Sequence, residues 1–134
     1  MIIFRLATIF CLLFVCGCST QKDAILNRWY HQINTKYNAI YYANKHLQSA
    51  IEEINQSHND NYQKILTINK YADLRAAKSA QPSLDRAIQK STLAIKKHSM
   101  DIGGEEKNPL VDDAYFIIGC ANFYKQDYVA AINT

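Results

Sequence analysis

The sequence predicts an all-α fold built from antiparallel helical hairpins, and three observations support this. Apolar residues recur at spacings of three and four in three separate stretches, which places them on one face of a helix each time. Pro82 and Pro109 stand where a proline suits the first turn of a helix. No stretch shows a clear alternation of apolar and polar residues, as a half-buried strand would. The length of 134 residues suits one small domain.

The N-terminus has the composition of a signal peptide. An apolar run from 6 to 15 follows Arg5, and it is too short to cross a bilayer as a helix, which needs about 20 residues. The run ends in Val15, Gly17 and Cys18, which resembles the lipobox of bacterial lipoproteins. We therefore expect residues 1–17 to be removed as a signal peptide and Cys18 to carry the lipid. An ordinary signal or a membrane anchor is the alternative.

The residues after Cys18 indicate where such a lipoprotein lodges. Ser19 comes next, and the first acidic residue is Asp23. By resemblance to known sorting rules, this implies the outer membrane, with the protein facing the periplasm and residues 18–23 acting as a lipidated tether. Two or three acyl chains hold a protein stably, whereas one binds only marginally. Cys120 would be the lone unmodified cysteine, which excludes an intrachain disulfide, and we expect it to be a small buried hydrophobe.

Residues from about 24 to 56 predict a helical hairpin or one long broken helix. The hairpin is preferred, with a turn or bend at Asn44 and Lys45, because two short amphipathic helices can bury their stripes against each other. The aromatic residues around Trp29 and Tyr37 allow two interpretations, a peptide-binding surface or core packing, and core packing is preferred. The apolar positions are Leu26, Trp29, Tyr30, Ile33, Tyr37, Ile40 and Tyr41, then Leu47, Ala50, Ile51 and Ile54.

The second and third helices have start or stop signals. Residues 57–61 are a loop by composition, and the sequence gives no firm prediction for 62–80. We expect the second helix to begin near Pro82 and to end at the basic residues 96–98, which suit the negative end of the helix dipole. Residues 101–107 are expected to be a flexible loop. Asn108 is expected to cap the third helix, with negative charge at Asp112 and Asp113 near its start.

The last part of the chain, residues 108–134, has a helix–turn–helix pattern. Residues 114–123 predict a helix, Gln126 and Asp127 a turn, and Tyr128 the start of another helix. The pattern is similar to a tetratricopeptide repeat, a unit of 34 residues. Asn122 and Gln126 depart from it, replacing an aromatic residue and the usual turn glycine. The matching residues are Tyr115, Ile118, Gly119, Ala121, Phe123, Tyr128 and Ala131, of which Gly119 and Ala131 are expected to be small so that the helices approach closely.

The repeat resemblance implies the start of an α-solenoid. Residues 24–107 would be an N-terminal helical region with a degenerate repeat, and residues 108–134 a tetratricopeptide repeat that is incomplete at its C-terminus. Because about three repeats are needed to bury a continuous core, we expect a longer solenoid protein or a truncated gene product.

Several segments together carry a more specific resemblance. With the lipobox, residues 28–31, 57–62, 85–88, 95–99, 111–115, Gly119 and 123–125 resemble the N-terminal region of the tetratricopeptide lipoproteins of the Bacteroidetes type IX secretion and gliding-motility machinery. The resemblance implies a lipid-anchored scaffold that binds other envelope proteins in protein transport or surface motility. The alternatives are a repeat lipoprotein of envelope assembly or nutrient uptake, and a helical module of a larger cell-wall enzyme.

The composition argues against other functions. Lys and Arg number 15 against 12 Asp and Glu, without a basic cluster, so we expect no nucleic-acid partner. No catalytic residue, phosphate-binding loop or cofactor site is recognisable, so we expect neither an enzyme nor a small-molecule substrate. His31, His46, His58 and His98 lack metal-ligand spacing, and we expect them to face solvent, with no metal bound.

Overall fold

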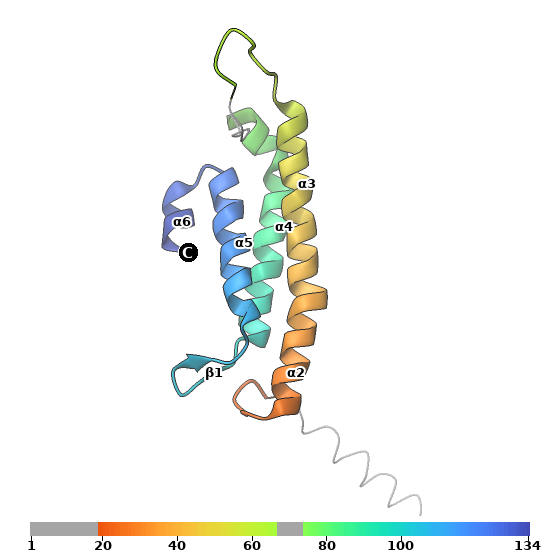
Figure 1. The fold of residues 1–134 in the computed structure, drawn as a ribbon, viewed down its shortest axis with the longest axis vertical. Helices are drawn as coiled ribbons and strands as arrows, with labels where there is room; N and C mark the ends of the chain where they lie inside the picture. The colour runs from red at the N-terminus through yellow and green to blue at the C-terminus, as the bar shows by residue number, and fades with distance from the viewer. Residues whose placement is uncertain (1–18, 67–73) are drawn as a thin grey trace, which may run out of the picture.

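A computed structural model describes residues 19–66 and 74–134 of the chain (Figure 1). The predicted all-α class is confirmed for these residues, apart from one two-stranded sheet. None of the helices in these two ranges is long and apolar enough to cross a membrane. The elements in chain order are α2 (Ile25–Asn34), the π-helical segment η1 (Thr35–Ile40), α3 (Tyr41–Ser57), α4 (Leu74–His98), β1 (Asp101–Ile102), β2 (Glu105–Glu106), α5 (Leu110–Tyr124) and α6 (Tyr128–Asn133).

The first helical stretch is one continuous helix, so the preferred hairpin was wrong. The segments α2, η1 and α3 follow one another without a turn, and Asn44 and Lys45 lie inside α3. No degenerate helix–turn–helix repeat is therefore contained within residues 25–57. The reason is that α4 supplies the antiparallel partner: it runs back beside α3 (Figure 1). The expected stripe of Leu47, Ala50 and Ile54 is buried in that contact, as the spacing indicates.

The contact between α3 and α4 is built largely from small side chains. Ala43 and Ala50 on α3 and Ala80 and Ala87 on α4 are fully buried. Alanine loses no side-chain entropy on folding and lets two helix backbones approach closely. Larger side chains fill the space at intervals, and Ile54 on α3 and Leu84 on α4 are the largest of them that are fully buried.

Helix α4 starts earlier than the sequence predicts. It begins at Leu74, and Pro82 lies in its interior instead of its first turn. A proline there removes one hydrogen bond and disfavours the helix by roughly 3 kcal/mol. The buried residues Ala76, Ala77 and Ala80 explain why the helix nevertheless extends before Pro82, since alanine has the highest helix propensity and these three also pack in the core. The predicted end at His98 is confirmed.

The segment between α4 and α5, expected to be a loop, contains the two short strands. Asp101 pairs with Glu106, and Gly103 and Gly104 have positive φ in the turn between the strands. The Glu106 carboxylate accepts hydrogen bonds from the backbone N–H of Met100 (2.7 Å) and of Asn108 (2.8 Å). Burial alone raises the pKa of Glu106, but these bonds and that from Ser99 outweigh it and hold the pKa below its usual value.

Candidate protein-binding groove

Helix α5 buries one face in the core, and its other face is only partly covered, by α6. The Asn108 side chain accepts a hydrogen bond from the backbone N–H of Leu110 (3.3 Å), but the N-cap position of α5 is Pro109 and not the expected Asn108. Asp112 and Asp113 lie in the first turn, as expected. The inner face packs into the core through Ala114, Ile117 and Ala121. The opposite face of α5 is the one that meets α6.

A tight turn reverses the chain after α5 at the position that the sequence indicates. Gln126, where the repeat pattern has glycine, adopts a φ of 64°. This left-handed conformation is disfavoured for residues with a side chain. Asp127 then caps α6, since its carboxylate accepts a hydrogen bond from the backbone N–H of Ala130 (3.1 Å). As a result α6 lies back alongside α5 (Figure 1).

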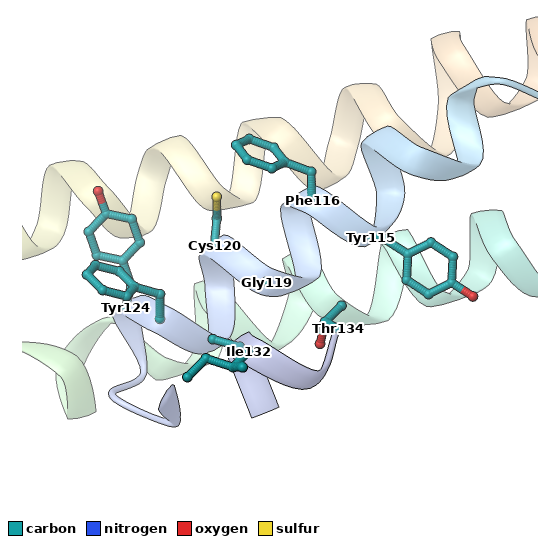
Figure 2. A pocket seen from close by; sticks show the side chains of 9 residues that line it. Tyr115, Phe116, Gly119, Cys120, Tyr124, Ile132 and Thr134 are labelled. Carbon is teal, nitrogen blue, oxygen red and sulfur yellow. The ribbon is translucent and has the colours of Figure 1, made fainter. Parts of the chain in front are cut away.

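A groove of about 550 Å³ lies over the outer face of α5 beside α6 (Figure 2). Its floor consists of two rows of residues on α5 at intervals of four, so each row runs along one side of the helix. The lining contains no Lys, Arg, Asp or Glu, which makes the groove an apolar one. The lining residues are Tyr115, Gly119 and Phe123 in one row, Phe116, Cys120 and Tyr124 in the other, and Ala131, Ile132 and Thr134.

The predicted repeat residues are only partly gathered in this groove. Tyr115, Gly119, Phe123 and Ala131 line it. The others do not: Ala121 is fully buried in the core, Ile118 is half-buried, and the Tyr128 ring packs against the Phe123 ring at a centroid distance of 5.7 Å.

Sequence reasoning missed several of the lining residues. Phe116, Cys120 and Tyr124 were not among the predicted site residues, although their spacing of four marks one side of a helix. The repeat pattern does not include this second row. Ile132 and Thr134 were also missed, because only the turn at Gln126 brings α6 against α5.

We expected Gly119 to be small because a side chain would keep the two helices apart, but the helices are far enough apart to accommodate a methyl group. A Cβ atom added at Gly119 would lie 3.7 Å from the Ala131 carbonyl oxygen, which is ordinary van der Waals contact. The backbone of α5 therefore has room for a methyl group at this position. What Gly119 provides is an open floor to the groove.

Cys120 is half-buried, and it combines two roles of an apolar side chain. It packs against the core and also lines the groove. Burial raises the pKa of its thiol, so the thiol stays protonated at neutral pH. The expectation of a small buried hydrophobe therefore holds in part, because one side of the residue remains accessible from the groove.

The aromatic residues of the first helix are exposed, so the preferred core packing was wrong. Trp29 is 64% exposed and Tyr37 66%, and of the seven positions in the predicted stripe of α2 and its continuation only Ile40 is buried. The buried face carries polar residues instead, namely Asn27, His31 and Thr35. The aromatic residues thus form an exposed surface, whereas the peptide binding of the alternative interpretation stays a prediction.

The solvent-facing prediction is wrong for His31. It is 3% exposed, and its Nδ1 lies 3.0 Å from Nδ1 of the half-buried His98, a hydrogen-bond distance. Thr35 and Asn108 continue this cluster: the Asn108 amide donates to Thr35 Oγ1 and to the His98 carbonyl, both at 2.9 Å. The polar residues at 27, 31 and 35 were a signal of the cluster, but the two histidines are 67 positions apart, so the sequence does not reveal their pairing.

Cys18, the expected lipid attachment site, and the signal peptide 1–17 lie outside the described residues. Among those residues, no three His, Cys, Asp or Glu side chains are grouped so that they could hold a metal ion. No protein-family model and no curated protein sequence matches this chain.

Proposed function

We propose that this chain is a lipid-anchored, periplasm-facing scaffold of the outer membrane, which binds a helix of another envelope protein in the groove between α5 and α6. The observation that carries the binding role is the groove, with its uncharged lining of aromatic and aliphatic side chains. The process that it serves, type IX secretion or gliding motility, rests on the family resemblance of the sequence.

The shape of the groove favours a helix as the bound element. The two rows on α5, from Tyr115 to Phe123 and from Phe116 to Tyr124, run along the helix with a furrow between them. The ridge of a second helix packs into such a furrow, and apolar residues at intervals of three and four would face the aromatic rings. Among the aromatic side chains of the groove, Phe116 is the most exposed, at 73%, so such a helix would cover it. In this proposal α5 and α6 form a tetratricopeptide-type pair.

The lipid anchor has a direct test. Cys18→Ala removes the only thiol of the lipobox that the lipid would use, so the variant should lose labelling by a fatty-acid analogue and leave the membrane fraction. Cys120→Ala is the matched control, because it removes a cysteine from the groove and should keep both properties. Continued fatty-acid labelling of the Cys18→Ala variant would disprove the anchor.

The binding role is tested by recovering the full native protein from its own membranes in mild detergent and identifying its partners by mass spectrometry. We expect components of outer-membrane export or of the motility motor. Phe116→Ser should lose them, since it removes an exposed ring from the groove without opening the core. Tyr62→Ser, which changes an 82% exposed ring in the loop after α3, should retain them.

Two other results are informative. Recovery of only nutrient-uptake or cell-wall proteins would replace the secretion role by one of the alternative lipoprotein functions. Equal recovery from Phe116→Ser and Tyr62→Ser would mean that the groove is not the binding site.

A further inference from the structure

A second apolar surface lies on the N-terminal helix, remote in the sequence from the groove. Its residues share one side of α2 and η1, and each is between 38% and 86% exposed. We call this surface the aromatic stripe; it consists of Ile25, Leu26, Trp29, Tyr30, Ile33 and Tyr37. At about 1.5 Å per residue, the stripe is roughly 18 Å long. Scattered exposed apolar residues need no explanation, but a continuous stripe of this kind marks an interaction site.

The helix that carries the stripe is amphipathic, but its polar side faces the protein core and its apolar side faces outward. Its buried side is polar, with Asn27 and His31, while its largest apolar side chains point outward. The stripe is therefore not a surplus of core residues left at an edge. The Asn27 amide bonds to the Ser19 and Lys22 carbonyls (2.6 and 3.2 Å), which fixes the start of the helix with the stripe outward.

The charges beside the stripe favour an anionic partner. No Asp or Glu occurs between Asp23 and Glu52. Arg28 in that interval forms an ion pair with Asp23, so the net positive charge comes from Lys36 and Lys45. The Lys36 ammonium is 5.4 Å from the Tyr37 ring centroid, so positive charge borders the aromatic surface directly. Trp and Tyr flanked by Lys and Arg, on a helix with one apolar side, are typical of segments that lie in the interface of an anionic membrane.

We infer that the aromatic stripe rests in the headgroup region of the membrane that holds the lipid, so that α2 lies along the bilayer surface. The inference rests on the proposed anchor, because Ile25 follows Cys18 by only seven residues and the stripe would start at the membrane. A tether this short keeps the stripe at a high local concentration of lipid, so a modest intrinsic affinity suffices for docking. The groove between α5 and α6 would then stay free for a protein partner.

Trp29 allows this to be measured, because it is the only tryptophan of the chain. The full protein, processed in its native envelope, is reconstituted in vesicles of phosphatidylethanolamine and phosphatidylglycerol in equal parts. We expect the Trp29 emission to shift to the blue and to be quenched when the acyl chains are brominated. Leu26→Ser should lower the docked population about tenfold, the effect of losing one buried apolar side chain. Val129→Ser, at a comparably exposed position on α6 that does not line the groove, should leave the quenching unchanged.

The anchor is read separately, by mass spectrometry of the N-terminal peptide and by flotation of the vesicles. An acylated protein that floats while Trp29 remains in water would overturn the inference and leave the anchor intact. A blue-shifted Trp29 that brominated lipid does not quench would also overturn it, because a protein surface would then cover the stripe. Quenching without acylation would keep the membrane face and remove the anchor.

Discussion

At the scale of single residues, the polar side chains that the first helix buries are the least expected feature. Leu26 and Trp29 have the spacing of a buried stripe, yet His31 and Thr35 occupy the buried face. The apolar spacing identifies a helix correctly, but it does not reveal which side faces the core when both sides have a consistent pattern. The buried side is the one whose polar residues find hydrogen-bond partners in distant parts of the chain, His98 for His31 and Asn108 for Thr35.

The histidine pair should make stability depend on pH. Burial lowers the pKa of His31; burial, then the neighbouring His31 and Lys97, lower that of His98. Both folded pKa values thus lie below the unfolded value of 6.5, so the unfolded chain binds more protons as the pH falls through that value. We expect the free energy of unfolding to keep its highest value above about pH 6.5 and to decrease as the pH falls below 6.5. Urea titrations at several pH values would show this.

His31→Gln should flatten part of this pH dependence and lower the free energy of unfolding at neutral pH by about 1–2 kcal/mol, because a buried hydrogen bond is disturbed. Some dependence should remain, since burial and three cationic neighbours also lower the pKa of His46. A His31→Gln profile as steep as that of the parent would rule out the histidine pair as its source.

Glu106 should contribute at lower pH. Its folded pKa is held below its usual value, so its stabilising effect is present above the unfolded pKa and disappears as the pH falls through the folded one. Glu106→Gln should lower the free energy of unfolding at pH 7 by about 1 kcal/mol, since its charged hydrogen bonds are partly exposed to water. Glu52→Gln, on the exposed side of α3, provides the comparison in the same urea titration. An equal loss in both variants would contradict the stabilising role of the Glu106 hydrogen bonds.

At the scale of elements, the helices were predictable and their connections less so. The C-terminal end of α4, the start of α5 and the turn at Gln126 follow from charge, helix-start signals and the repeat pattern. The long first helix does not, because nothing local distinguishes a turn at Asn44 from a helical continuation. The π-helical segment η1 helps to explain how the helix continues through this region. Its wider turn changes the phase of the helix, so that a polar buried side before it continues as the apolar side of α3 after it.

Helix α5 offers a test of the close-approach argument. Gly119→Ala should raise the free energy of unfolding by about 0.5–1 kcal/mol, because alanine favours the helix and its methyl group fits. Thermal and urea unfolding would measure the change, with Ala121→Gly as the reverse control in the same helix. A loss of stability in Gly119→Ala would show that α5 and α6 are closer than the 3.7 Å contact implies.

At the scale of the whole molecule, two apolar surfaces lie on different elements. The groove is formed by α5 and α6, and the aromatic stripe by α2 and η1. The sequence indicates half of the groove through the row that contains Gly119, because that row belongs to a repeat pattern. It does not indicate the row that contains Phe116, nor that the stripe is exposed, because both depend on which helix faces which. That relation is settled by packing between distant segments.

The proposed binding role is tested most directly by crosslinking in living cells. A photoreactive phenylalanine at position 116 would lie in the groove, and the same residue at position 62 would lie in an exposed loop as the matched control. We expect position 116 to form one discrete adduct with another envelope protein, and position 62 to form none. An adduct of equal yield from both positions, or no adduct from position 116 in cells where the protein is functional, would contradict the scaffold function.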